Sequence, residues 1–154
     1  MASTYSTNLK IELIGSGSQA GTWGDTTNVN LGVTLEEAIT GRAAVEFFAD
    51  DDLTLTAVNL NTTQPFRHLL LDVTSTVVLT EERDLIVPAI TKQYIVWNQT
   101  TGGQALTVRT SAGTGVSVLP GERAHLFVNG VDVEHAITSV NGTAVPSTGQ
   151  LLAW

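Results

Sequence analysis

The sequence predicts a mainly β protein. It would have an antiparallel β-sandwich or jelly-roll body and one short N-terminal helix after a glycine- and tryptophan-containing loop. β-Branched residues dominate, with 23 Thr and 17 Val among 154 residues, and such side chains suit a pleated sheet. Short apolar stretches are separated by turn residues every 8–12 positions or so. Helical periodicity occurs only between residues 25 and 41.

Composition excludes several classes of protein. The net charge is −8, from 15 acidic and 7 basic residues, and the bases are scattered, so we expect no nucleic-acid partner. The chain has no cysteine, which excludes a disulfide framework and a thiolate zinc site. No apolar stretch approaches the roughly 20 residues of a membrane span, and residues 1–10 do not resemble a signal peptide. We therefore expect no membrane insertion.

The first segment, residues 1–8, is polar and is predicted to be an extended N-terminal arm. Leu9, Ile11 and Leu13 then alternate with polar residues, which predicts a short strand. This strand opens a strand–loop–helix docking module, residues 9–41, which we expect to pack on the body.

Residues 15–20, GSGSQA, match the dinucleotide-binding pattern G-x-G-x-x-A. That pattern binds a pyrophosphate only when a helix begins at the loop. Here residues 21–24, GTWG, interrupt any such helix. We interpret the segment as a tight loop and predict no cofactor.

The helix is predicted to start after this loop. Asp25, Thr26 or Thr27 would cap it, and Gly41 would follow its end. Its apolar face, at helical spacing, consists of Leu31, Leu35, Ala38 and Ile39.

Trp23, just before the cap, has two interpretations. The favoured one is a core anchor that folds the loop onto the helix. The other is a contact with a partner molecule, and Trp23 is therefore also a candidate docking residue.

The body is predicted to span residues 42–137. Residues 92–98, KQYIVWN, form the strongest strand and should be central, whereas Pro88 marks an edge or a strand end. The other predicted strands are residues 42–49, 53–56, 66–73, 75–80, 85–87, 105–109, 116–119, 123–128 and 131–137. A two-residue turn at Asn129 and Gly130 would place His125 opposite Glu134 as a weak cross-strand pair.

The sequence contains no marked catalytic arrangement. Asp50, Asp51 and Asp52 raise the hypothesis of calcium binding, but they lack the ligand spacing of a calcium loop, so we favour a solvated turn. The three histidines are scattered, and no serine lies in a nucleophile motif. We predict no catalytic, cofactor or metal site and no enzyme activity.

The C-terminal arm, residues 138–154, ends in Leu151, Leu152, Ala153 and Trp154. Such an apolar end leaves apolar surface in water unless something covers it. It either folds back on its own domain or docks on a neighbouring copy, and composition does not separate these alternatives. Leu151, Leu152 and Trp154 are candidate inter-subunit contacts.

A resemblance to a known family adds a functional expectation. Residues 5–15, 19–24, 27–28 and 30–32, with looser similarity over 100–108 and 121–131, resemble a module of tailed-bacteriophage virion proteins of the tail fibre-like or head decoration-like kind. The resemblance covers about residues 5–135. It implies a non-enzymatic virion component that is assembled in the host cytoplasm in symmetric copies, and it supplies no catalytic residue.

The leading hypothesis is therefore a structural component of a tailed-phage particle, a tail fibre, appendage or capsid decoration. By analogy with such proteins we expect a homotrimer that binds other virion proteins. The alternative is a receptor-binding module that recognises a host-surface carbohydrate. A depolymerase is disfavoured because nothing marks a pair of catalytic acids.

Overall fold

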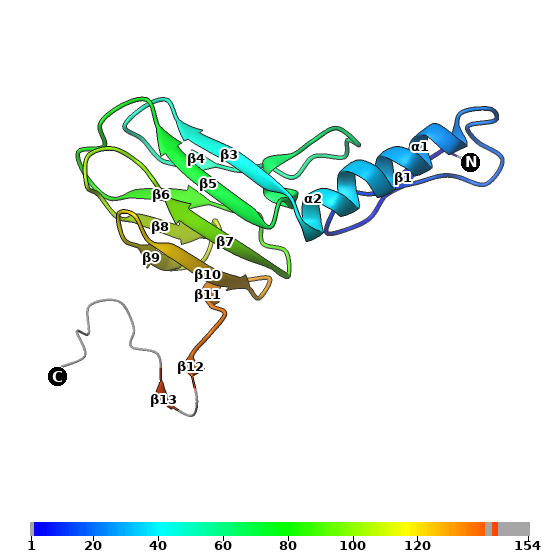
Figure 1. The fold of residues 1–154 in the computed structure, drawn as a ribbon. Helices are drawn as coiled ribbons and strands as arrows, with labels where there is room; N and C mark the ends of the chain where they lie inside the picture. Colours follow the sequence, from blue (N-terminus) through cyan, green and yellow to red (C-terminus); the bar gives the residue numbers. More distant parts are fainter. Residues whose placement is uncertain (1, 141–142, 145–154) are drawn as a thin grey trace.

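The computed structural model of the protein describes residues 2–140 and 143–144. It is mainly β, with several sheets and one helical segment near the N-terminus (Figure 1). The prediction of a mainly β chain with an N-terminal helix is confirmed.

Two large sheets form the body. The five-stranded sheet has the order β11-β10-β7-β5-β3, and the four-stranded sheet has the order β4-β6-β8-β9. The first sheet contains β3 (Arg42–Phe47), β5 (Leu70–Ser75), β7 (Lys92–Asn98), β10 (Arg123–Val128) and β11 (Val133–His135). The second contains β4 (Leu53–Thr54), β6 (Arg83–Ile86), β8 (Leu106–Arg109) and β9 (Val116–Val118).

The chain passes back and forth between these sheets. From β3 to β8, each odd-numbered strand lies in the first sheet and each even-numbered strand in the second, so successive strands within one sheet run parallel. Only the last strands, β9 to β11, pair antiparallel with their neighbours in these two sheets. The prediction of an antiparallel body is therefore wrong for four strand pairs, and the jelly-roll alternative is not confirmed.

The hydrophobic core lies between the two sheets. Strand β3 alternates buried and more exposed residues, and β7 and β10 show the same period of two. Both sheets contribute fully buried residues, such as Phe47 and Leu71 from the first and Leu85 and Val108 from the second. Strand β7 is the middle strand of its sheet, as predicted. Pro88 lies just past the end of β6, which confirms its interpretation as a strand end.

The hairpin between β10 and β11 is longer than predicted. The Asn129 side chain accepts hydrogen bonds from the backbone N–H groups of Val131 and Asp132, each at 2.8 Å, and this closes a four-residue loop. Phe127 therefore pairs with Glu134. The predicted pairing of His125 with Glu134 is wrong, because it assumed a two-residue turn.

Asp132 fastens this loop to the loop before β9. Its carboxylate accepts the backbone N–H of Thr114 at 3.0 Å, of Gly115 at 2.9 Å and of Val133 at 2.7 Å. The Thr114 hydroxyl donates a further bond at 2.9 Å. The backbone bond from Thr114, with the others, lowers the pKa of Asp132 from its ordinary 3.8 to about 2.

We predict that this lowered pKa makes stability depend on pH. A carboxyl whose folded pKa is depressed contributes stability above its unfolded pKa and loses it as pH falls through the folded pKa. The contribution of Asp132 to the melting temperature should therefore be constant above about pH 4 and should decrease as the pH falls from 3.8 towards 2. Asp132→Asn should flatten part of that decline, and Asp51→Asn, at an exposed turn position, should leave it unchanged. Identical pH profiles for both variants would contradict the assignment.

The N-terminal region forms a projection from the body. A short ladder of β1 (Thr4–Tyr5) and β2 (Glu12–Leu13) precedes one continuous helical segment. That segment comprises α1 (Trp23–Val29), the π-helix η1 (Asn30–Leu35) and α2 (Glu36–Ile39). The prediction places this module on the body. The helix instead points away from the sheets, and only its C-terminal end meets them (Figure 1).

Two further short elements complete the described chain. The 3-10 helix η2 (Pro65–Arg67) lies at the base of the projection, immediately before β5. The pair β12 (Ser139–Val140) and β13 (Thr143–Ala144) follows the body.

Candidate functional site

The projecting helix exposes apolar side chains. Trp23 is 62% exposed, Leu31 56% and Ile39 65%, and Leu35 between them is half-buried. Within α1 no residue is buried. An apolar row on a surface helix normally faces the protein's own core, so the exposure of this row makes it a candidate contact surface.

The opposite side of the same helix carries polar residues that are buried. Thr34 is fully buried and Glu37 is 7% exposed. The burial pattern is thus inverted relative to an ordinary surface helix, which places its apolar stripe towards its own core.

Gly41 explains how the helix ends so close to the body. Its N–H donates to the carbonyl oxygens of Glu36 and Glu37 at 3.1 and 3.2 Å, which closes the last turn. A Cβ at this position would lie 2.5 Å from the Glu37 carbonyl oxygen and 2.7 Å from the His68 ring. Only glycine allows the helix and the imidazole to approach this closely.

Arg67 holds the projection to the body. Its side chain is fully buried. Its guanidinium donates to four backbone carbonyl oxygens, those of Leu9, Lys10, Leu60 and Thr62. Its Nη1 also lies 3.5 Å from the Glu37 carboxylate. Because one side chain binds the N-terminal strand region, the 60–63 loop and the helix, it fixes three segments relative to one another.

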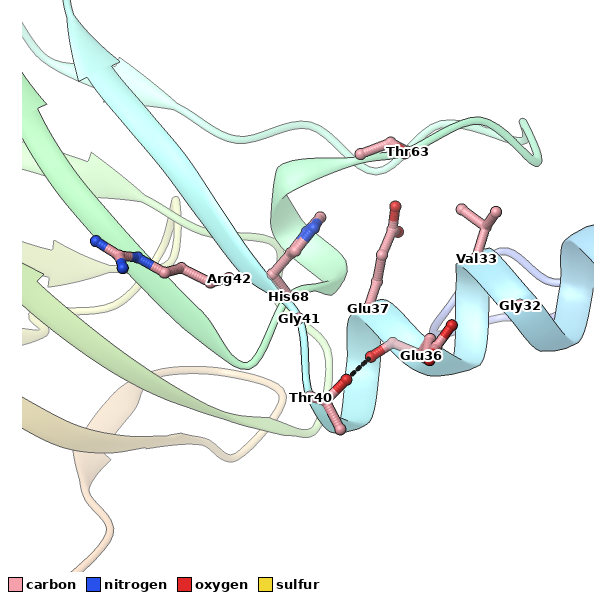
Figure 2. A pocket seen from close by; sticks show the side chains of 9 residues that line it. All are labelled: Gly32, Val33, Glu36, Glu37, Thr40, Gly41, Arg42, Thr63 and His68. Carbon is pink, nitrogen blue, oxygen red and sulfur yellow. Dashed lines mark hydrogen bonds between the residues drawn. The ribbon is translucent and has the colours of Figure 1, made fainter.

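Glu37 lines a shallow cavity of about 350 Å³ at this junction (Figure 2). Both of its carboxylate oxygens are buried and make no direct hydrogen bond. Among the described residues, the ion pair with Arg67 is what offsets the cost of burying this negative charge. The Nδ1 atom of His68 lies 3.1 Å from the carbonyl oxygen of Gln64. The cavity is lined by Gly32, Val33, Glu36, Glu37, Thr40, Gly41, Arg42, Thr63 and His68.

A polar network around Glu12 joins the remaining parts of the projection. The Glu12 carboxylate accepts hydrogen bonds from the side chains of Gln19 and Asn61, and Asn30 bonds both backbone groups of Glu12. Gln19 also accepts the Thr26 hydroxyl at 2.6 Å. The β2 strand, the glycine-rich loop, the helix and the 60–63 loop are therefore held as one unit.

Trp23 is the first residue of α1 and points into solvent. The interpretation of Trp23 as a core anchor is wrong, because the loop and helix pack through polar side chains instead. Its interpretation as a docking residue stays a prediction. Leu151, Leu152 and Trp154 lie outside the described residues.

The other candidate groups do not converge. The Asp50 carboxylate accepts hydrogen bonds from Arg83 at 2.8 Å and from Thr80. These bonds, of which the one from Arg83 has the largest effect, lower the pKa of Asp50 to about 2. His125 bonds to Gln93 at 2.9 Å. Within residues 2–140 and 143–144, no group of three or more histidine and acidic side chains is placed to bind a metal ion. In the same part of the chain, no helix is both long and apolar enough to cross a membrane.

Sequence reasoning missed Arg67. In the sequence, Arg67 is recognisable only as a charged residue that precedes the largely apolar run HLLLDV. Three of its partners lie far away in the chain: Leu9 and Lys10 are 58 and 57 positions earlier, and Glu37 also precedes it by a long stretch of sequence.

Comparison of this chain with models of protein families, with curated proteins and with solved structures finds no match.

Proposed function

We propose that the protein is a non-enzymatic structural component of a tailed-phage virion, a tail fibre, appendage or capsid decoration that self-assembles and attaches to the particle. The observation that carries this proposal is the projecting helix, which turns Leu31 and Ile39 towards solvent and buries Glu37. A surface of this kind suits attachment to another protein.

The sequence resemblance also points to the projecting region as the attachment element. Residues 5–32, where the similarity to tailed-phage virion proteins is most specific, form the β1–β2 ladder, the glycine-rich loop and most of the helix. The body behind it is proposed to be a β-sandwich that carries this attachment element. By analogy, the assembled form is a homotrimer located in the virion and in contact with other virion proteins.

Analysis of purified particles tests this proposal. The phage that encodes the chain is grown, its particles are purified on a density gradient, and the chain is quantified by mass spectrometry and located by immunogold labelling. We expect a fixed copy number per particle and labelling at one structure of the tail or the capsid. Recovery of the chain only from the soluble lysate would overturn the proposal.

A carbohydrate-recognition module is the second candidate, and one surface favours it. On the outer face of the five-stranded sheet, the Trp97 ring and the Arg123 guanidinium stack at 3.7 Å. Asp72, the neighbour of Trp97 in register, binds Arg42 and Gln99. Because the guanidinium covers one face of the ring, a sugar would pack against this Trp97–Arg123 stack and form hydrogen bonds with the charged and amide groups around it.

This candidate predicts a loss of glycan binding on substitution. Retention of a host-surface glycan on an array should fall at least about tenfold in Trp97→Ala, because the stacking surface is removed. Trp23→Ala, which alters the projecting helix instead, should retain the glycan. Binding that is absent in the unaltered chain, or equal in both variants, would exclude this surface as the receptor site.

A further inference from the structure

We propose that the cavity at the base of the projecting helix binds a primary alkylammonium group, and that the Glu37 carboxylate accepts the hydrogen bonds of its N–H donors. Free diamines carry such a group, and so do the lysine side chains of other proteins. The inference goes beyond the proposed function and does not depend on it, because it concerns the chemistry of this cavity alone.

The Glu37 carboxylate is buried but lacks hydrogen-bond donors. The residue is 7% exposed, and within the described part of the chain neither carboxylate oxygen makes a hydrogen bond. Figure 2 shows the side chain extending from the helix between His68 and Val33, below the loop that carries Thr63. A carboxylate can accept about four hydrogen bonds, so this one has capacity for the donors of a ligand in the cavity.

The neighbouring arginines leave that capacity unused. Four hydrogen bonds tie the Arg67 guanidinium to backbone carbonyl oxygens, which leaves it a single N–H. Its Nη1 lies 3.5 Å from the Glu37 carboxylate, too far for a good N–H···O hydrogen bond. Arg42, the other cation at the cavity, points away from Glu37 and binds Asp72 (Figure 2). The ion pair with Arg67 therefore offsets charge without supplying a hydrogen bond.

The rest of the polar lining also favours a cationic donor. The Nδ1 atom of His68 lies 3.1 Å from the carbonyl oxygen of Gln64. Because a carbonyl oxygen only accepts, Nδ1 carries the proton, and Nε2 of the neutral ring is left as an acceptor. Glu36 adds a second carboxylate to the lining. An ammonium group matches such a lining, since it combines a positive charge with several N–H donors on one atom.

A metal ion fits this cavity less well than an ammonium group. Among residues 2–140 and 143–144, no group of three or more histidine and acidic side chains is placed to bind one. Divalent cations in proteins take several such ligands. An ammonium group needs only hydrogen-bond acceptors, which the cavity supplies.

An apolar wall next to the cavity fits the alkyl chain of the ligand. A second hollow of about 570 Å³ shares Val33 and Thr63 with the first, and Val29, four positions before Val33 on the helix, also lines it. Methylene groups can pack along these valines while the ammonium group contacts Glu37. Asn61 lines the second hollow and has a buried Oδ1 without a hydrogen-bond partner. Each hollow thus contains a buried acceptor that lacks a donor.

Isothermal titration calorimetry of the full chain with n-butylammonium tests the site. We expect saturable binding at one site per chain. n-Butanol has the same alkyl chain without the charge, and tetramethylammonium has the charge without an N–H donor. Both should bind at least about tenfold more weakly, which corresponds to the loss of one charge-assisted hydrogen bond. Equal binding of all three compounds, or no saturable binding of n-butylammonium, would overturn the inference.

Two variants test whether binding occurs in this cavity. Glu37→Gln keeps the shape of the side chain but removes its charge, and it should weaken binding at least about tenfold. Gly32→Phe should block the cavity, because Gly32 lines it and a Cβ there meets no atom within 4 Å. Gly24→Phe is the matched control, since Gly24 has the same free space on the same helix but does not line the cavity.

The control variant should bind n-butylammonium as the unaltered chain does, and circular dichroism should show that it and Gly32→Phe are folded. Because Glu37→Gln leaves the buried Arg67 cation without its counter-ion, Gly32→Phe decides the test if Glu37→Gln unfolds. Unchanged binding in Gly32→Phe, or an equal loss in Gly24→Phe, would refute the site.

Two further probes identify the source of the ammonium group. Cadaverine represents a free diamine, and the methylamide of N-acetyl-lysine represents a lysine side chain within a protein. Comparable binding of the two supports a lysine of a partner protein as the ligand. Binding of the lysine derivative that is at least about tenfold weaker supports a free diamine. Failure of both probes to bind would overturn the inference.

Discussion

Replacing Arg67 by methionine is expected to lower the free energy of unfolding by about 3–5 kcal/mol, the range for removal of one partner of a buried ion pair. The substitution keeps a long apolar stem but removes every donor of the guanidinium. The four carbonyl oxygens that it binds would lose their partner, and the buried carboxylate of Glu37 would lose its counter-ion. Since whole domains are stable by only about 5–15 kcal/mol, the variant would be close to unfolding.

Urea unfolding monitored by tryptophan fluorescence measures this effect. Arg42→Met is the control, because Arg42 also pairs with an acidic side chain, Asp72, but the Arg42 side chain is 59% exposed. Its loss should cost much less, about 1 kcal/mol, because water screens the exposed guanidinium and Asp72 keeps its hydrogen bond from Gln99. Equal losses in the two variants would show that Arg67 does not hold the projection to the body. Hydrogen exchange should locate the first loss of protection in residues 9–13 and 60–63.

Gly102→Ala should destabilise the protein by about 3 kcal/mol or more, through left-handed backbone strain and overpacking together. Gly102 has φ of +112°, and a Cβ there would lie 2.1 Å from the backbone carbonyl oxygen of Leu79. That oxygen belongs to a fully buried core residue whose own N–H donates to Thr101 at 2.9 Å. The backbone therefore has little freedom to yield.

The adjacent glycine provides the control. Gly103 also has a positive φ, +69°, but a Cβ there meets no atom within 4 Å. Gly103→Ala should cost only the backbone strain, about 1 kcal/mol. Calorimetry should therefore show a melting temperature several degrees lower for Gly102→Ala than for Gly103→Ala. The same melting temperature for both would rule out the steric argument.

The strands could be predicted from sequence, but their partners could not. A period of two in residues such as Tyr94, Val96 and Asn98 marks a strand with one buried face. The same period arises whether the neighbouring strand runs parallel or antiparallel, so periodicity does not encode direction. The hairpin register was misplaced because the side chain of Asn129, and not only its backbone, closes the loop.

The helix could also be predicted, but not the direction of its apolar face. Leu31, Leu35 and Ile39 satisfy the helical period, and that pattern normally predicts burial against the chain's own core. The buried cation of Arg67 instead draws Glu37 inward, which turns the leucines outward. The decisive residue lies 30 positions beyond Glu37, so no local pattern contains it.

The alternation of strands between the two sheets has a consequence for how insertions in the sequence would alter the length of the body. Each back-and-forth pass adds one strand to each sheet and contacts mainly the passes before and after it, as in solenoid proteins. Insertion of one further pass would lengthen the body by about 4.8 Å, the spacing of neighbouring strands. The helical projection at one end and the closing β10–β11 hairpin at the other would remain unchanged. Chains with duplicated passes would therefore have a longer body with the same two ends.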